Sequence, residues 1–480
     1  MENRVELKKT LKPMHVWALA VGSIIGFGCF VLPGSWLPKA GPMGAAIAFV
    51  LGAAFMLVIA YNYGFMIKNF PVAGGEFAYA YEAFGRNHAF VCGWFLTLGY
   101  LCLIPSNGSA LAVLGRYVAP GFFTHGYMYS IAGWDVYLGE ILLASAGILI
   151  FGILNYRGVQ AVGSIQIVMS ALLCGSVLLI TAGSFLSPES SFSNLEPLFA
   201  PGKSILASVA VVLAIAPFLF VGFDTIPQSA EEFNFSHDKS LKLMVTAIII
   251  GGLMYAAVSL STAVVAPWQQ LIAGKPVWAT GQAMHQTLGA FGLLFLMIAV
   301  LMAICTGING FYMATSRLLF SMARSKVIPS FFADVHPKYK TPYKAILFIL
   351  VISLIAPWFG RQAIIWIVDM CAVGTAIGYL YTCLAPYVLH KSNPGLEGGS
   401  KAKIVSVLGS LFSIVFLVLL LVPGSPAVLE IPAWIALAAW VAMGLAFYAT
   451  MAKRYQQIPK EELDYLVLGE LSPNTIRRKV

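Results

Sequence analysis

Two short segments of this 480-residue chain contain helix-breaking residues, which can free backbone groups to bind charged molecules. Residues 22–30 read GSIIGFGCF, with three glycines within seven positions, and residues 216–224 read APFLFVGFD, which joins a proline, a glycine and an acid. Proline removes an internal hydrogen bond, and glycine weakens a helix by about 1 kcal/mol relative to alanine. A helix opened at such places presents amide N–H groups to anions and carbonyl oxygens to cations. A zwitterion such as an amino acid suits both ends.

The composition indicates that these segments lie inside a membrane protein. Hydrophobic residues make up 59% of the chain and charged residues only 10%, whereas a soluble protein carries roughly a quarter charged residues. A water-soluble enzyme is therefore nearly excluded. Apolar runs predict helices at residues 15–37, 43–67, 88–117, 136–154, 161–185, 205–228, 241–267, 288–322, 344–359, 363–389, 404–422 and 431–451. Residues 276–287 are too short to cross a bilayer and predict an extramembrane or re-entrant helix.

The lysines and arginines predict the orientation of these helices. When the helices alternate across the bilayer, all but five of the 29 lysines and arginines fall on one face. The positive-inside rule makes that face cytoplasmic, so both termini are expected on the cytoplasmic side of the cell membrane. The net charge of +9 then reports orientation, and nucleic acid is not expected as a partner. The five exceptions are Lys39, Arg116, Lys203, Lys275 and Arg361.

The two interrupted segments fall in the first and sixth predicted helices. These are corresponding members of two five-helix halves, and such a pair predicts the central site of an inverted-repeat transporter. Non-helical backbone at membrane depth is tolerated only where protein or a water-filled cavity satisfies it. The alternative is that the glycines only permit close helix packing and that Pro217 is a passive kink.

Several motifs resemble signatures of the amino acid, polyamine and organocation permease superfamily. GSIIGFGCFVLPG is similar to its first-helix signature, FLFVGFDTIPQSAEE to its sixth, and SRLLFSMARSKVIPSFFADVHPKYKTPYKA to its eighth helix and following loop. PVAGGEFAYAYEAFG and VDMCAVGT match as well. The resemblance extends from about Leu11 to His390.

The resemblance implies an all-α polytopic membrane protein of about 12 transmembrane helices. Its leucine-transporter type fold would contain two inverted five-helix repeats, broken helices 1 and 6, and two peripheral helices. The expected divisions are a cytoplasmic N-terminus at 1–10, the first repeat at 11–186, the second repeat at 187–390, two further helices at 391–453 and a cytoplasmic C-terminal tail at 454–480.

The resemblance also implies secondary transport of an amino acid or related amine by alternating access. An ion gradient or a counter-substrate would drive it. The substrate carboxylate would lie on backbone amides around residues 26–28, the amino group near carbonyls of the sixth-helix break, and the Phe218 ring over the substrate. Asp224 matches an acidic position linked to ion coupling or gating. The candidate substrate-binding residues are Gly22, Ser23, Ile25, Gly26, Phe27, Gly28, Phe218, Phe220, Gly222, Phe223 and Asn309.

Two positions depart from the family pattern. Phe27 stands where the family usually has a serine or threonine, so a hydroxyl that could bind a carboxylate is missing. Many members carry a lysine in the fifth helix, but residues 161–185 contain no charged residue, and the lysine-based proton mechanism is not carried over. Proton coupling, sodium coupling and exchange therefore all stay open.

Other polar residues within or beside the helices have structural and functional interpretations. Asp369 is interpreted as a tie between helices, and Glu231 and Glu232 as partners of the basic loops or of a gate. Arg317 is interpreted as an interfacial anchor or a gate partner. Ser106 and Asn107 follow Pro105 and form another polar kink.

Catalytic and cofactor motifs are absent from the sequence. It contains no HExxH, GxSxG or Walker A pattern, and its seven cysteines show no metal-ligand spacing. No enzyme activity, metal or cofactor is expected. An exchanger of amino acids or polyamines is the alternative function, and a channel lined by the same broken helices is a further one. The sequence does not indicate an oligomeric state.

Overall fold

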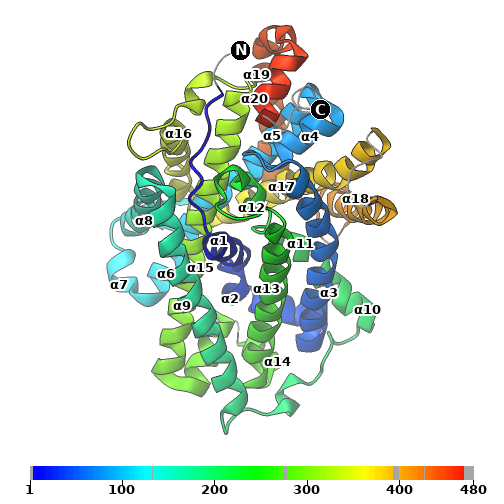
Figure 1. The fold of residues 1–480 in the computed structure, drawn as a ribbon. Helices are drawn as coiled ribbons and strands as arrows, with labels where there is room; N and C mark the ends of the chain where they lie inside the picture. Colours follow the sequence, from blue (N-terminus) through cyan, green and yellow to red (C-terminus); the bar gives the residue numbers. More distant parts are fainter. Residues whose placement is uncertain (1–3, 132, 275–277, 393–398, 426, 470–480) are drawn as a thin grey trace.

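Helices make up nearly all the regular structure of the computed structural model, which describes residues 4–131, 133–274, 278–392, 399–425 and 427–469 (Figure 1). The elements up to residue 195 are α1 (Pro13–Ile24), α2 (Gly28–Val31), α3 (Pro33–Asn69), α4 (Glu76–Phe84), α5 (Arg86–Leu101), α6 (Leu103–Val118), α7 (Pro120–Phe123), β1 (Tyr127–Ile131), β2 (Trp134–Tyr137), α8 (Leu138–Arg157), α9 (Val159–Leu186) and η1 (Phe192–Leu195).

The second half of the chain is also built from helices. Its elements are α10 (Ile205–Leu213), α11 (Ala216–Leu219), α12 (Thr225–Gln228), η2 (Ala230–Glu232), α13 (Lys239–Val264), α14 (Trp268–Ala273), α15 (Ala279–Arg324), η3 (Ser330–Ala333), α16 (Tyr343–Ser353), η4 (Ala356–Phe359), α17 (Gly360–Ser392), α18 (Gly399–Leu421), α19 (Ile431–Gln457) and α20 (Lys460–Leu468).

The prediction of an all-α polytopic membrane protein is confirmed. Ten helical segments of the described residues are long and apolar enough to cross a membrane. The two other predicted spans are shorter pieces. Residues 205–228 are divided among α10, α11 and α12, and residues 343–359 form a short apolar helix.

The boundaries differ from the sequence prediction at several places. The fourth span was predicted to begin at residue 136, but Val136 belongs to β2, which pairs antiparallel with β1. The aromatic and β-branched residues of the two strands, together with Gly133 at φ +79°, favour this hairpin, and α8 begins only at Leu138. The predicted C-terminal tail contains the helix α20.

The predicted short helix before the eighth span is present over its described part. Residues 276 and 277 lie outside the described residues, and the helix is observed from Ala279. It turns at Gly289, whose φ of +61° suits a residue without a Cβ, and continues as α15.

The helix that carries the first break lies at the centre of the bundle. Figure 1 shows α1 in the middle of the bundle, and it packs against α9, α13, α15 and the short α12. In the most apolar stretch of residues 13–31, 72% of the residues are buried, against 11% in α19. The first span is thus enclosed by protein, whereas α19 lies at the edge.

Candidate functional site

The first span is interrupted at residues 25–27. α1 begins at Pro13, where the fixed φ and missing N–H of proline fit the first helical turn. The Ile25 N–H still donates to the Val21 carbonyl at 3.0 Å, as in a helix. The ψ of Ile25 is 79°, which is not helical, and the Gly26 N–H donates to the Ile24 carbonyl at 3.1 Å, only two residues back. The chain becomes helical again only at α2. The predicted break is therefore present.

The sixth span is interrupted at residues 220–224. α10 is capped by Ser204, whose hydroxyl accepts the Ala207 N–H at 3.2 Å. After α11, Gly222 takes a φ of +142°. The Asp224 carboxylate accepts the Gly222 N–H at 2.7 Å, and the Thr225 hydroxyl donates to the Gly222 carbonyl at 2.6 Å. These side chains stabilise the broken backbone.

The two breaks touch each other at Gly222. A Cβ built on Gly222 would lie 2.5 Å from the Ile24 nitrogen and 2.5 Å from the Ser23 carbonyl carbon. Real Cβ atoms do not approach backbone this closely, so only glycine fits between the two spans.

Gly222→Ala is expected to destabilise the protein. The backbone conformation alone costs about 1–3 kcal/mol for a residue with a Cβ, and the contact with Ile24 adds to it. Thermal unfolding of purified protein measures the effect. Gly175→Ala on α9 is the control, because nothing lies within 4 Å of its Cβ position. An unchanged Tm for Gly222→Ala would contradict the close approach.

A cavity of about 260 Å³ lies beside the two breaks. Apolar side chains supply most of its wall. The lining residues are Ser23, Ile24, Gly26, Phe27, Gly28, Leu32, Leu103, Ser106, Asn107, Phe218, Leu219, Val221, Tyr255, Phe311, Val368 and Asp369.

The structure brings five of the predicted substrate-binding residues to this cavity and places six elsewhere. Those that line it are Ser23, Gly26, Phe27, Gly28 and Phe218. Those outside its lining are Gly22, Ile25, Phe220, Gly222, Phe223 and Asn309. Asp224 is also outside the lining and is fully buried behind the break. The role of all these residues in binding stays a prediction.

Three polar atoms of the lining residues are buried without a hydrogen-bond partner among the described residues. They are the Ser23 hydroxyl, the Ser106 hydroxyl and the Asn107 carbonyl oxygen. Buried polar atoms are normally satisfied, and an unsatisfied one costs about 1–3 kcal/mol. The Ser23 hydroxyl lies against Gly310 of α15, and the Asn107 amide lies against Gly307 of the same helix.

A second cavity of about 380 Å³ shares Phe218, Val368 and Asp369 with the first. Its lining includes the exposed residues Lys39 and Glu430, so it reaches the surface. Phe218 therefore stands between the inner cavity and this outer one, and Asp369 of α17 places a carboxyl group at the same boundary.

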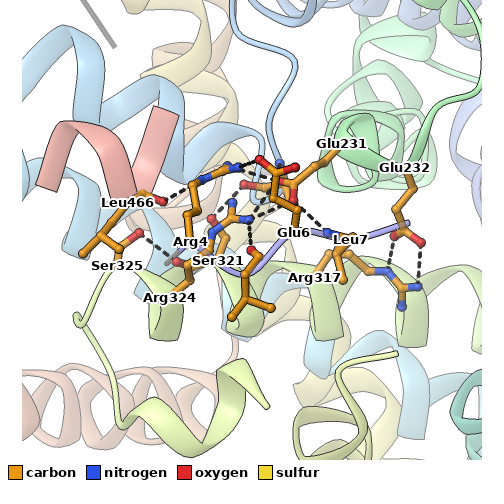
Figure 2. A network of polar contacts seen from close by, with 12 residues as sticks. Arg4, Glu6, Leu7, Glu231, Glu232, Arg317, Ser321, Arg324, Ser325 and Leu466 are labelled. Carbon is orange, nitrogen blue, oxygen red and sulfur yellow. Dashed lines mark hydrogen bonds and ion pairs between the residues drawn. The ribbon is translucent and has the colours of Figure 1, made fainter. Parts of the chain in front are cut away.

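Buried ion pairs hold the opposite side of the breaks closed (Figure 2). Arg317 of α15 pairs with Glu232 at 2.7 Å, and both side chains are at most 2% exposed. Arg324 pairs with Glu231 at 2.9 Å. The pairing predicted for these acids is present, but with arginines of α15.

The N-terminal arm (residues 4–12) joins this cluster of ion pairs. The Arg4 guanidinium lies 3.2 Å from Glu231 and also donates to the Leu466 carbonyl of α20 at 3.3 Å. The Leu11 N–H donates to the Glu232 carbonyl at 3.0 Å, and the Leu11 carbonyl accepts the Asn234 N–H at 2.9 Å. The arm therefore pairs with the backbone that follows the sixth span.

A chain of buried amides is a feature that the sequence analysis missed. The Gln166 amide group on α9 donates to the Ala18 and Thr306 carbonyls, each at 3.3 Å. Its oxygen accepts from Asn309 at 2.7 Å, and Asn309 accepts from Asn155 at 2.9 Å. Asn309 thus bridges helices. An isolated glutamine in an apolar run was the available signal for Gln166.

Comparison with known proteins identifies the family. The family model described as "amino acid permease" matches residues 11–447. A methylthioribose transporter of Bacillus subtilis is 24% identical over 465 residues, which is 95% of each chain. The branched-chain amino acid permease BcaP of the same species is 27% identical over 480 residues, or 94% of this chain and 95% of the relative.

A plant relative also matches. The vacuolar cationic amino acid transporter 4 of Arabidopsis thaliana is 27% identical over 406 residues, which is 81% of this chain and 64% of the relative. The superfamily inferred from the motifs is confirmed. The chain belongs to the amino acid permease family, as a multi-pass membrane transporter with broken first and sixth helices.

Proposed function

We propose that this protein is a secondary transporter that carries an amino acid or related amine across the cell membrane by alternating access. The observation that carries the proposal is the cavity between the two broken spans, with unpaired polar atoms from Ser23, Ser106 and Asn107. Lack of a Walker A motif in the sequence argues against ATP as the direct energy source.

The lining favours a small zwitterion with an apolar side chain. The backbone around Gly26 and Gly28 would receive the carboxylate, while Leu103, Val221 and Phe311 offer apolar surface to the side chain. Asp369, at the boundary of the two cavities, would attract an ammonium group. The name of one bacterial relative refers to branched-chain amino acids, which are zwitterions of this kind, whereas the name of the other refers to methylthioribose, an uncharged sugar.

The conformation is proposed to face outward. The distribution of lysines and arginines puts the N-terminal arm and the buried ion pairs on the cytoplasmic side, and the cavity that contains Lys39 then leads outside. Alternating access requires this cluster of ion pairs to open while the passage past Phe218 closes.

Uptake into liposomes tests the proposed function. Purified protein is reconstituted, and each of the twenty amino acids is tested with its labelled form outside and excess unlabelled form inside. We expect saturable uptake of at least one of them, accelerated by the internal pool. Uptake that does not saturate, with ion conductance above carrier rates, would indicate a channel. Absence of uptake for every amino acid, and for polyamines and other amines tested in the same way, would reject the proposal.

Phe218→Ala is expected to raise the KM for uptake about tenfold, because the lost aromatic contact is worth about 1.5 kcal/mol. Phe218 stands between the two cavities, so its removal also joins them. Uptake kinetics measure the change. Phe122→Ala is the control, since that ring is 74% exposed. An unchanged KM would place the substrate away from Phe218.

A further inference from the structure

Glu76 is a fully buried acid outside the cavity. It is the first residue of α4, between the second and third spans, and its side chain points to the interior of the bundle. Its Oε1 atom accepts from the Tyr63 hydroxyl of α3 at 2.9 Å and lies 3.1 Å from the Tyr100 hydroxyl of α5. Its Oε2 atom accepts from the Gln228 amide of α12.

The Tyr100 hydroxyl connects Glu76 to Asp224. It lies 2.9 Å from the Asp224 Oδ2 atom and 3.0 Å from the Asp224 carbonyl oxygen. Asp224 is fully buried too. Two acids from different parts of the chain therefore meet at one phenolic oxygen.

Hydrogen-bond counting favours a proton at this contact, because the Tyr100 hydroxyl faces three acceptor oxygens, Glu76 Oε1, Asp224 Oδ2 and the Asp224 carbonyl. The Tyr100 hydroxyl has one hydrogen and can donate to one carboxylate only. If both acids were ionised, the other carboxylate would face the phenolic oxygen with no hydrogen between them. If either acid is protonated, it donates to Tyr100, and Tyr100 donates to the other acid. One proton therefore satisfies the whole chain from Glu76 to Asp224.

The surroundings provide no countercharge for a second ionised acid. None of the described residues that hydrogen-bond to Glu76 or Asp224 carries a positive charge. The titratable groups that face Glu76 are Tyr63 from α3, Tyr79 from its own helix, Cys92 and Tyr100 from α5, Asp224 from the break and Tyr379 from α17. Two carboxylates in a dry site without a cation cannot both ionise at low cost.

We propose that Glu76 and Asp224 hold one proton between them through Tyr100, and that this acid pair binds the proton that moves with the substrate. The inference rests on the proposed function as a transporter. Burial and the Asp224 charge raise the pKa of Glu76, which lies outside the spans, to about 8, in agreement with a proton held at neutral pH.

The position of Glu76 and Asp224 suits the coupling of proton movement to substrate movement. Glu76 belongs to α4, whereas Asp224 and Gln228 belong to the segment that leads to Glu231 and Glu232. When that segment moves and the ion pairs open, the two acids separate and water reaches them. The shared proton then leaves to the cytoplasm, and one proton accompanies each substrate. Because proton binding favours the conformation that holds it, falling pH favours the outward-facing form.

Infrared spectroscopy tests the shared proton without substrate. Difference spectra between pH 6 and pH 9 are expected to contain the C=O stretch of one protonated carboxylic acid. Glu76→Gln and Asp224→Asn should each remove this band completely, because an amide then supplies the hydrogen to Tyr100. Glu82 on the same helix would add a band of its own, because burial raises its pKa to about 7, so every spectrum is recorded in a Glu82→Gln background. In that background Glu189→Gln, which removes an exposed acid, is the control and should leave the band. A band that survives undiminished in Glu76→Gln would overturn the proposal.

Proton movement tests the coupling role. Liposomes that contain a trapped pH-sensitive dye receive the amino acid with the highest uptake, and the interior should acidify. Glu76→Gln is expected to reduce this acidification at least about tenfold while counterflow of labelled amino acid stays within about threefold. Uptake by the wild type without acidification would reject the coupling role. Absence of any uptake would instead reject the proposed function.

Tyr100→Phe keeps the proposal testable if Glu76→Gln does not fold. This variant retains both acids and removes the hydroxyl that they share. The ionised partner loses its donor, so the acid band is expected to persist to higher pH than in the wild type. An unchanged pH midpoint would mean that Tyr100 does not connect the pair and would overturn the proposal.

Discussion

Gly26→Val is expected to reduce uptake at least about 100-fold, which corresponds to about 3 kcal/mol, while the protein still folds. A Cβ built on Gly26 meets nothing within 4 Å, so the backbone tolerates a side chain. That open space belongs to the proposed substrate cavity. A valine there would occupy the place of the substrate carboxylate. Uptake and Tm, measured on the same preparation, separate the two effects.

Gly175→Val is the matched control for this variant. Gly175 lies on α9, and its Cβ position is also free of neighbours within 4 Å, but it does not line the cavity. Both variants should keep the wild-type Tm, and only Gly26→Val should lose uptake. Normal uptake by a folded Gly26→Val protein would exclude the assigned position of the substrate.

Glu231→Gln is expected to destabilise the side closed by the buried ion pairs by about 3–5 kcal/mol, as removal of one partner from a buried ion pair generally does. Arg324 and Arg4 would keep their charges without the Glu231 carboxylate. The Leu7 and Ala73 amides, which donate to Glu231 at 3.0 and 3.2 Å, would face a neutral amide instead. Hydrogen exchange of residues 4–12 should become faster, and uptake should fall.

Glu6→Gln is the control for the loss of an acid on the same arm. Glu6 also pairs with Arg4, at 2.8 Å, but its side chain is 63% exposed, and exposed pairs contribute about 0–1 kcal/mol. In this variant, hydrogen exchange of residues 4–12 should be as slow as in the wild type. Equal exchange in Glu231→Gln and the wild type would show that the cluster of ion pairs does not hold the arm.

The ion pairs of Glu231 should not respond to physiological pH. Burial raises the pKa of Glu231, but the charges of Arg324 and Arg4 outweigh it and lower the pKa to about 2. Because this value lies below that of an unfolded glutamate, the stabilisation is present above about pH 4.5 and is lost only as pH falls through about 2. Sensitivity near pH 8 is expected instead from Glu76, whose pKa burial raises to about 8.

The sequence was sufficient for the features that depend on backbone chemistry. Glycine and proline weaken helices wherever they occur, so the breaks near Gly26 and Gly222 were predictable from residue types alone. The long apolar runs likewise predicted the spans, because a bilayer requires them. The motifs that indicated the family include these same two broken segments.

The sequence was insufficient for contacts between distant segments. Glu76 looks like an ordinary acid in a polar loop, and only the folded chain brings it to Tyr100 and Asp224. The sequence left two interpretations of Asn309 open, contact with the substrate and a hydrogen bond between helices, since the partner of a polar residue in a span is not visible in sequence. In the structure both of its amide atoms bond to Gln166 and Asn155.

Main-chain hydrogen bonds between the N-terminal arm and the segment after the sixth span have a consequence for sequence divergence. The bonds of the Leu11 N–H to Glu232 and of the Asn234 N–H to Leu11 use no side chain. Any amino acid with a free N–H can form them. Loss of Arg324 and Glu231 from the sequence would leave these bonds intact, so the attachment of the arm does not depend on the charged residues beside it.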